Sequence, residues 1–435
     1  MSAILIRNGR IIDGTGHQPL QNGSILIENG RFKEITNRDI KVPPQADVIE
    51  AAGKTALPGL IDMHAHLLSG GFDTITEVID SFDVQTQKRA LKQMLYWGVT
   101  TVYNPVQPLD GGLQLREDAA AGWFPSPRLF ISGPGFTAPG GWAGSLLPIA
   151  RMEPHDLKEA EQQVQQLAEA KVDILKIYYD TQCCAFLSPL PKLEKSIMEA
   201  IIRQAHAMKL RVMLHAYDNE YHKDALRAGI DILAHSAVTA PIDEEYIELA
   251  KDSKVLYLST LSIYHDAFNE KSLRNYVAQD FVQNTISKKT LETLAAGGPL
   301  DGFEKSIKQS YLMEQLPTIQ ANLKKIFQNG VAIGVGPDTG VMGAFPGLSV
   351  HREMELMVQA GVPPASVLMA ATKTAAQYLE ASEFGTIEPG KVADLILING
   401  EPLKDIRDTR NIDMVIQNGV IIDREKLLQE IQEYQ

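Results

Sequence analysis

Leu57-Pro-Gly-Leu-Ile-Asp-Met-His-Ala-His66 is the most informative stretch of this sequence. It is an apolar run that ends in two histidines separated by one residue. Alternate residues of a strand face the same side, so His64 and His66 would point together from the end of a strand. A neutral imidazole is a common zinc ligand. Two histidines on an exposed strand edge would give the same pattern, so this stretch alone leaves both interpretations open.

The central part of the chain alternates short apolar runs with helical patterns, which is typical of βα units around a parallel sheet. Eight strands, most followed by a helix, predict an α/β fold with a closed (β/α)8 TIM-like barrel. The predicted strands are Thr55–Ile61, Thr100–Tyr103, Arg128–Ser132, Ile174–Tyr178, Arg211–His215, Ile232–His235, Val255–Ser259 and Val331–Val335. The predicted helices are Gln87–Tyr96, Pro154–Ala170, Lys192–Met208, Lys223–Ala228, Glu244–Lys251, Thr318–Gln328, Leu348–Ala360 and Pro364–Leu379.

Two stretches are too long for ordinary barrel connections. Gly133–Pro148 is rich in Gly and Pro and reads as a loop after the third strand. Ser262–Pro317 follows the seventh strand and contains helical patterns at Leu273–Phe281 and Phe303–Met313. Long βα loops lie at the face of a barrel that carries the active site, so the second stretch is predicted to form a lid or a substrate wall.

Both ends of the chain show short strand patterns separated by Asn-Gly pairs. The pairs begin at Asn8, Asn29, Asn399 and Asn418, and such pairs are typical of hairpin turns. Neither end is long enough for a stable sheet alone, so we expect both to join in one small β-sandwich domain. The predicted division is 1–56 for its N-terminal part, 57–384 for the barrel and 385–435 for its C-terminal part.

Ionisable residues recur at the ends of the predicted barrel strands. His215 and His235 each end a strand, Asp338 lies just beyond one, and Lys176 lies within one. Burying such groups without partners costs several kcal/mol. Any single one could be a hydrogen-bonded core residue. Because all would meet at one face of the barrel, together with His64 and His66 they predict a metal centre.

Composition limits the class of protein. The chain has 435 residues, 44% hydrophobic and 22% charged, with a net charge of -13, which suits a globular protein and disfavours an extended nucleic-acid surface. No apolar segment has the length of a membrane span, and the N-terminus lacks a signal-peptide pattern. We therefore expect a cytoplasmic protein that acts on a small-molecule substrate. A homo-oligomer is compatible with the sequence. The adjacent Cys183 and Cys184 are expected to be free thiols.

Several motifs resemble those of the amidohydrolase superfamily over nearly the whole chain. They are Asn8–Gly16, Pro58–His66, Gly98–Val102 and Gly385–Ile398. Within that superfamily, His351-Arg-Glu-Met-Glu-Leu and Ala370-Ala-Thr-Lys-Thr-Ala-Ala376 are most similar to the imidazolonepropionase and metal-dependent prolidase branch.

The resemblance implies a role for each residue of the predicted centre. His64, His66 and Asp338 would hold the more buried ion, and His215 and His235 would hold a second. Lys176 would bridge them as N6-carboxylysine, although an ammonium paired with a carboxylate is the alternative. One or two divalent ions, expected to be zinc, would activate hydroxide to attack an amide, peptide or cyclic amide carbonyl. Asp338 would be the catalytic proton carrier.

The sequence also departs from the peptidase pattern, and this leaves the substrate open. Lys176 is followed by Ile-Tyr-Tyr-Asp-Thr-Gln-Cys-Cys184 where relatives often have Ser-Gly-Gly, and Gly140-Gly-Trp142 replaces Gly-Gly-His. Tyr178, Tyr179 and His265 are candidate substrate contacts, with ordinary packing as the alternative.

Two other functions remain open from the sequence. One is a mononuclear deaminase of an aminated heterocycle, although such enzymes typically have Glu where Asp218 follows the fifth strand. The other is a relative without catalytic activity, which the complete set of ligand types disfavours. The remaining histidines, at positions 17, 155, 206, 222 and 351, are expected to be solvated or locally bonded.

Overall fold

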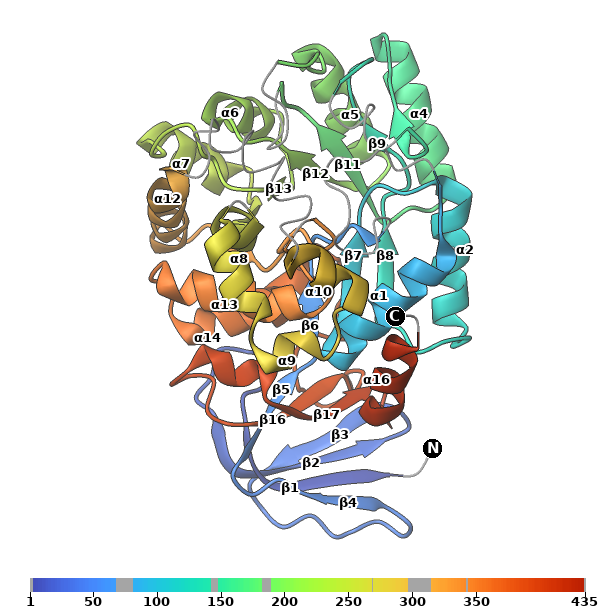
Figure 1. Cartoon of the computed structure of the whole chain (residues 1–435), viewed down its shortest axis with the longest axis vertical. Helices are drawn as coiled ribbons and strands as arrows, with labels where there is room; N and C mark the ends of the chain where they lie inside the picture. The colour runs from blue at the N-terminus through green and yellow to red at the C-terminus, as the bar shows by residue number, and fades with distance from the viewer. Residues whose placement is uncertain are drawn as a thin grey trace.

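The protein is elongated, with a barrel in one half and a separate sheet at the other end, as the computed structural model in Figure 1 shows. The structure describes residues 3–67, 81–141, 148–181, 189–267, 269–295, 314–341 and 343–433. Within these residues, the central strands run parallel and helices cover them on the outside (Figure 1).

The barrel has eight parallel strands in chain order. They are β6 (Leu60–Asp62), β7 (Val99–Asn104), β8 (Arg128–Ile131), β11 (Ile174–Tyr178), β12 (Arg211–His215), β13 (Ile232–Ala234), β14 (Leu256–Leu258) and β15 (Ala332–Gly334). Two backbone hydrogen bonds join the separate ladders into a ring. The amide of Asp173 donates to Ile131 O at 2.8 Å, between β8 and β11, and the amide of Met63 donates to Val335 O at 2.9 Å, between β15 and β6. The predicted α/β barrel is confirmed.

An outer layer of amphipathic helices packs on these strands through an apolar core. Four of them begin after an aspartate whose side chain accepts from a first-turn amide, at positions 83, 156, 218 and 243. The helices of the layer are α1 (Val84–Tyr96), α2 (Leu109–Ala120), α4 (Leu157–Glu169), α5 (Lys195–Ala207), α6 (Asn219–Arg227), α7 (Glu244–Asp252), α12 (Leu316–Gln328), α13 (Leu348–Gln359), α14 (Pro364–Met369) and α15 (Ala375–Tyr378).

Strands from both ends of the chain form one separate eight-stranded sheet, as predicted from the repeated turn pairs. Its strands are β1 (Ile4–Ile11), β2 (Leu20–Glu28), β3 (Arg31–Thr36), β4 (Asp47–Glu50), β5 (Lys54–Pro58), β16 (Leu395–Asn399), β17 (Ile412–Gln417) and β18 (Val420–Ile421). The antiparallel pairing of β5 with β16 joins the two ends of the chain. Its buried hydrophobic cluster includes Ile6, Phe32 and Leu395, and the uncharged polar residues Thr55 on β5 and Gln417 on β17 are buried as well. The exact domain boundaries stay a prediction.

Two sequence predictions about strands were wrong in detail. Thr55–Ile61 is not one strand, because the chain passes at Gly59 from β5 in the end sheet to β6 in the barrel. A side chain at Gly59 would collide with Thr100. Asn8-Gly9 is not a hairpin turn but lies inside β1. Its register with β2 shifts there, and Asn8 has φ 64°, so the pair forms a bulge.

The helices also depart from the prediction in places. Pro364–Leu379 is not one regular helix: a π-helical turn at Ala370–Thr374 separates α14 from α15. Leu273–Phe281 divides into α8 (Glu270–Val277) and α9 (Asp280–Gln283), followed by α10 (Lys288–Ala295). Within Gly133–Pro148, β9 (Gly135–Phe136) pairs with β10 (Arg151–Met152) and with β11. Phe303–Met313, Trp142, Cys183 and Cys184 lie outside the described residues.

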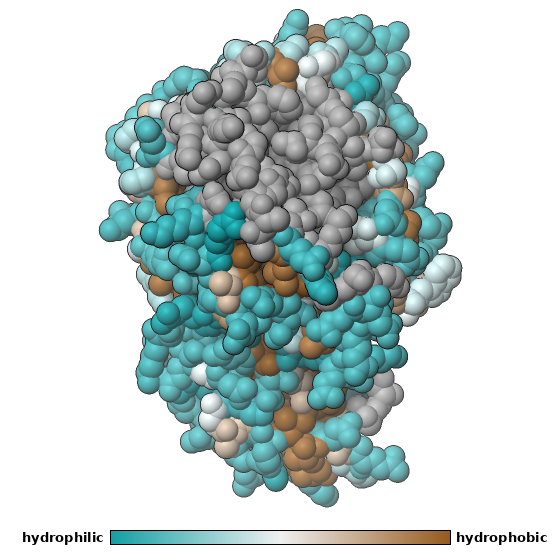
Figure 2. Space-filling view, in the orientation of Figure 1, coloured by the Kyte–Doolittle hydropathy of each residue, from teal (hydrophilic) through white to brown (hydrophobic). Residues whose placement is uncertain are grey.

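The coloured part of the surface in Figure 2 is mostly hydrophilic, with small groups of hydrophobic side chains between polar ones. None of the helices formed by the described residues combines the length and the apolar character needed to cross a lipid bilayer.

Candidate metal centre

The ends of β6 and β15 bring His64, His66 and Asp338 together. All eight strands are parallel, so their carboxyl ends open at one face of the barrel. The backbone of the Asp338 loop is bonded directly to the His64 segment: the amide of Thr339 donates to His64 O at 3.0 Å, and Ala65 pairs with Thr339. Residues that lie 272 or more positions apart in the chain therefore meet at one point.

The ligand atoms of these three side chains converge. Oδ1 of Asp338 lies 3.3 Å from Nε2 of His64 and 3.1 Å from Nε2 of His66. The two Nε2 atoms are 3.2 Å apart. One ligand atom from each residue lies within 4.8 Å of the other two. This spacing is compatible with one ion held by all three.

His215 and His235 form a second group beside the first. His215 ends β12, and His235 follows β13 directly. Their ring centroids are 4.6 Å apart, and the His235 ring lies 5.1 Å from that of His64. The structure therefore brings all four predicted imidazoles and Asp338 into one cluster.

Lys176 lies between the two groups. It is fully buried on β11, and its Nζ is 3.2 Å from Nε2 of His64 and 3.5 Å from the sulfur of Met213. Burial lowers the pKa of Lys176 to about 7, and the charge of Asp338 opposes that shift. Among the described residues, no carboxylate forms an ion pair with its Nζ. The alternative interpretation requires a carboxylate that pairs with the Lys176 ammonium, and the described part of the chain supplies none.

Burial also sets the charge of the imidazoles. It lowers the pKa of His64, His215 and His235 well below the usual value for histidine, and the positive charge of Lys176 adds to the effect. The three rings are therefore neutral near pH 7. A neutral imidazole has the lone pair that a metal ligand needs.

The donor set fits a divalent cation. Nδ1 of His235 and Oδ1 of Asp338 are buried and have no hydrogen-bond partner among the described residues. Buried polar atoms without partners cost free energy, so a cation bound by this cluster would offset part of that cost. Imidazole nitrogens with a carboxylate oxygen are a common ligand set for zinc and related ions.

Asp62 supports the cluster from behind, and the sequence analysis assigned it no role. Its buried carboxylate accepts from the amide of His64 at 2.9 Å and from the hydroxyl of Thr339 at 2.7 Å. Burial raises the pKa of Asp62 to about 7. The only signal for it in the sequence is a carboxylate inside an otherwise apolar run, directly before the two histidines.

Two of the cluster residues have a backbone conformation that is unusual for non-glycine residues. His235 has φ 75° and Asp338 has φ 60°. Such conformations cost about 1–3 kcal/mol each and tend to occur at functional sites, where the surrounding contacts hold them.

The three candidate substrate contacts lie in different places. Tyr178 faces the cluster, with its ring 5.2 Å from that of His215. Tyr179 directly follows the end of β11 and points to the opposite side, toward the helices, where its hydroxyl donates to Asp224 at 3.3 Å. His265 bonds to Asp266 at 2.8 Å and to Arg352 at 3.1 Å. The structure thus brings only Tyr178 of the three against the imidazoles.

Tyr217 is a neighbour of the cluster that sequence reasoning missed. Its ring centroid lies 4.9 Å from those of both His215 and His235, and 6.1 Å from that of Tyr264. The signal was available, because Tyr217 lies two residues after His215 and alternation directs both to the same side.

The other histidines have local partners, as expected. His222 bonds to Tyr246 and to Ala216 O, and His351 bonds to Thr409 and to Trp97 O. Burial lowers the pKa of both to about 4. His206 pairs with Asp231, and His17 is largely exposed.

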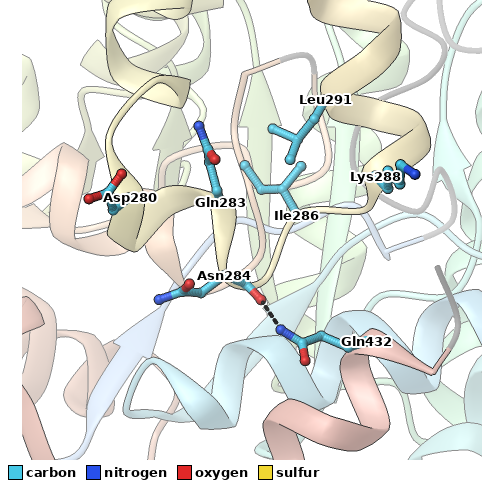
Figure 3. A pocket seen from close by; sticks show the side chains of 7 residues that line it. All are labelled: Asp280, Gln283, Asn284, Ile286, Lys288, Leu291 and Gln432. Carbon is cyan, nitrogen blue, oxygen red and sulfur yellow. Dashed lines mark hydrogen bonds between the residues drawn. The ribbon is translucent and has the colours of Figure 1, made fainter.

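A separate hollow of about 430 Å³ lies where α9 and α10 meet the last helix, α16 (Arg424–Gln432). Figure 3 shows its lining, which combines polar side chains with Ile286 and Leu291, and in which Gln432 donates to Asn284 O at 3.2 Å. No residue of the imidazole cluster lines it, so it is distinct from the candidate metal centre.

The fold and the cluster define the class: a parallel eight-stranded barrel with histidines and an aspartate converging where its strands end. The profile of the amidohydrolase family matches residues 55–422, and the chain belongs to this family.

Similar proteins extend this comparison. The structure of a Xaa-Pro dipeptidase with bound methionine covers 97% of this chain and 100% of its own, with a TM-score of 0.78 and 24% identity. That of molinate hydrolase covers 98% and 96%, with a TM-score of 0.76 and 21% identity. At these identities both show a shared fold. The dihydroorotase of Geotalea daltonii is 42% identical over 80 residues, which span 18% of this chain and 17% of that enzyme.

Proposed function

We propose that this protein is a metal-dependent hydrolase of an amide, peptide or cyclic amide C–N bond in a small molecule. The observation that carries the proposal is the convergence of His64, His66 and Asp338, whose ligand atoms lie within 4.8 Å of one another. His235 and Lys176 lie directly against His64, and His215 lies against His235.

The roles follow from the contacts. His64, His66 and Asp338 would hold one divalent ion, expected to be zinc, and His215 and His235 would hold a second. When bound, such ions polarise a carbonyl oxygen and make water acidic enough to react near neutral pH. Asp338, whose Oδ1 faces both Nε2 atoms of the first pair, would hold the ion through that oxygen, and its carboxylate would take a proton from water and deliver it to the leaving nitrogen.

Lys176 is the proposed bridge between the two groups, as N6-carboxylysine. An unmodified ammonium has donors only and is a poor metal ligand. A carbamate on Nζ would supply two anionic oxygens at the point where Lys176 meets His64.

Two contacts favour the hydrolase over the mononuclear deaminase. Lys176 occupies the middle of the cluster, where the deaminase scheme gives it no role. Asp218 is the residue that would have to replace the deaminase glutamate. Its side chain is instead the N-cap of α6, accepting from the amide of Glu220 at 2.8 Å.

The substrate class we propose is a dipeptide, an N-acyl amino acid or a lactam-like ring. Tyr178 and Tyr217 lie beside the imidazoles and offer flat apolar faces for such a molecule. The names of similar proteins, such as a Xaa-Pro dipeptidase and a dihydroorotase, indicate hydrolysis of C–N bonds.

The test combines metal analysis with a substrate panel. Purified protein, supplied with zinc, is analysed for bound metal and assayed with dipeptides, N-acyl amino acids, cyclic amides and aminated heterocycles. We expect one or two zinc equivalents and C–N bond hydrolysis that a chelator abolishes. Ammonia release from an aminated heterocycle, without amide hydrolysis, would favour the deaminase, and a protein that takes up no metal would contradict both enzymatic proposals.

A further inference from the structure

Glu353 is a buried carboxylate on α13 whose two oxygens accept hydrogen bonds from three groups of one segment. The hydroxyl of Ser259 donates to its Oε1 at 2.7 Å, and the amide of Leu261 donates to the same oxygen at 2.8 Å. The amide of Ser262 donates to Oε2 at 2.8 Å. The side chain is fully buried. One carboxylate on an outer helix therefore fixes the four residues that follow β14.

The segment held in this way has a conformation that needs support. Thr260, in its middle, is fully buried and has φ 51°, which is unfavourable for a β-branched residue. A conformation of this kind costs about 1–3 kcal/mol and persists only where surrounding contacts hold it. The three hydrogen bonds to Glu353 flank Thr260 on both sides and supply that support.

The same segment also forms hydrogen bonds with the residues beside His235 and beside Asp338. The hydroxyl of Ser236 donates to Ser259 O at 2.9 Å, and Ser236 directly follows His235. The hydroxyl of Ser262 donates to Pro337 O at 3.2 Å, and Pro337 directly precedes Asp338. His235 and Asp338 themselves have positive φ values. The segment after β14 thus links the two cluster residues whose backbones most need to be held.

We propose that Glu353 is a positioning residue of the metal centre: it holds the segment 259–262, which fixes the places of His235 and Asp338. This inference rests on the proposed function. It predicts that a residue without contact to the ion sets the affinity for it, as partners of metal ligands commonly do.

The test measures the zinc affinity of the folded protein, by competition with a chelator, together with its thermal midpoint. The variant is Glu353→Gln, which keeps the shape of the side chain. It replaces one of the two acceptor oxygens by an NH2 group, and this donor would face an N–H or O–H donor of the segment. We expect zinc to bind about 10–100-fold more weakly. The matched control is Glu355→Gln on the same helix, whose carboxylate pairs with Arg352 at 3.1 Å; it should leave zinc affinity unchanged even where it lowers the midpoint.

A second pair of variants tests whether Glu353 acts through the hydrogen bonds of Ser236 and Ser262. Ser236→Ala with Ser262→Ala removes both links from the segment and should also weaken zinc binding, whereas Ser253→Ala, which loses only a bond to Ala250 O, should not. If Glu353 acts through these links, Glu353→Gln has a smaller additional effect in the double-serine background than in the wild type.

The outcomes separate the claims. Wild-type zinc affinity in folded Glu353→Gln, or the same additional loss in both backgrounds, would overturn the positioning role. If Glu353→Gln does not fold, unchanged affinity in the double-serine variant would overturn it instead. A wild-type protein that binds no zinc would overturn the proposed function, and the inference with it.

Discussion

The mouth of the barrel and the sheet formed by the chain ends both enclose buried side chains, but the kinds of side chain that they bury differ. The buried interior of the end sheet is mainly apolar, with residues such as Ile6, Phe32 and Leu395, and the polar residues buried there, such as Thr55 and Gln417, are uncharged. The barrel mouth encloses His64 and Lys176, both fully buried, together with further imidazoles and Asp338. Apolar burial stabilises a fold directly, whereas buried ionisable groups without partners destabilise it. The comparison teaches that the end sheet stabilises the fold, whereas the ionisable groups buried at the barrel mouth are better explained by a role in metal binding.

His64→Ala should have the largest effect. It removes the residue that contacts His66, Asp338 and Lys176 at once. We expect loss of bound zinc and a fall in kcat/KM of at least about 10⁴-fold, which corresponds to about 5 kcal/mol. Metal analysis and steady-state kinetics check this. His17→Ala is the control, because that side chain is 83% exposed, and equal metal content in both variants would refute the assignment.

Asp338→Asn should come next, because it keeps the side-chain shape but removes the proton acceptor. General acid–base catalysis typically contributes about 10²–10⁴-fold, so kcat should fall by that amount. Kinetics at saturating substrate give the answer. A wild-type kcat in this variant would show that another group carries the proton.

Leu395→Ala tests the other side of the comparison. Leu395 is fully buried in the end sheet, so we expect a loss of about 2–5 kcal/mol in the free energy of unfolding. The kcat/KM of the folded protein, measured well below the unfolding transition, should not change. A variant of unchanged stability, or one that is folded but inactive, would break the distinction between the two regions.

Lys176→Met concerns the pH dependence of stability, and its effect per pH unit is the smallest of the four. Burial lowers the pKa of Lys176 to about 7, against an ordinary value of 10.5. Between these values the unfolded chain binds one proton more than the folded chain, so the free energy of unfolding of the metal-free protein rises with pH. The contribution is at most about 1.4 kcal/mol per pH unit.

Urea unfolding with a chelator present, at two pH values inside that window, measures this slope. The wild type should gain more stability than Lys176→Met as the pH rises. Parallel pH dependences in the two proteins would show that the lysine is not buried as an unpaired amine.

The sequence predicted the barrel strands and the cluster well, because both depend on short-range patterns. Apolar runs mark β11 and β12, and the ionisable residues at their ends stand out against them. Parallel strands then place those ends at one face whatever the loops do. The convergence of His64 with Asp338 therefore followed from topology alone.

Features that depend on tertiary contacts could not be predicted in this way. Helix α2 contains Gly111 and Gly112, which weaken a helical pattern. In the structure they let the helix approach closely, since a side chain at Gly111 would lie 2.8 Å from Phe82 and one at Gly112 would lie 2.6 Å from Gln107. Helix α16 is short, and its place is set by packing against α1, where Lys92 pairs with Glu430 at 2.7 Å.

The supporting residues were missed for the same reason. Asp62 and Glu353 accept hydrogen bonds from Thr339 and Ser262, which are far away in the chain. The sequence marks Asp62 only as a carboxylate inside an apolar run, and it does not mark Glu353 at all. Tyr179 shows the opposite error, a residue that the sequence suggested for the site but that the structure places outside it. It was a candidate contact by its place after Lys176, but alternation along β11 directs it to the helices.

The most direct test of the central claim is an anomalous difference map at the zinc absorption edge, from crystals grown with zinc. The account predicts a peak about 2.0–2.2 Å from Nε2 of His64, Nε2 of His66 and an oxygen of Asp338. A map with no peak at these three residues, or with zinc only at another place on the molecule, would contradict it.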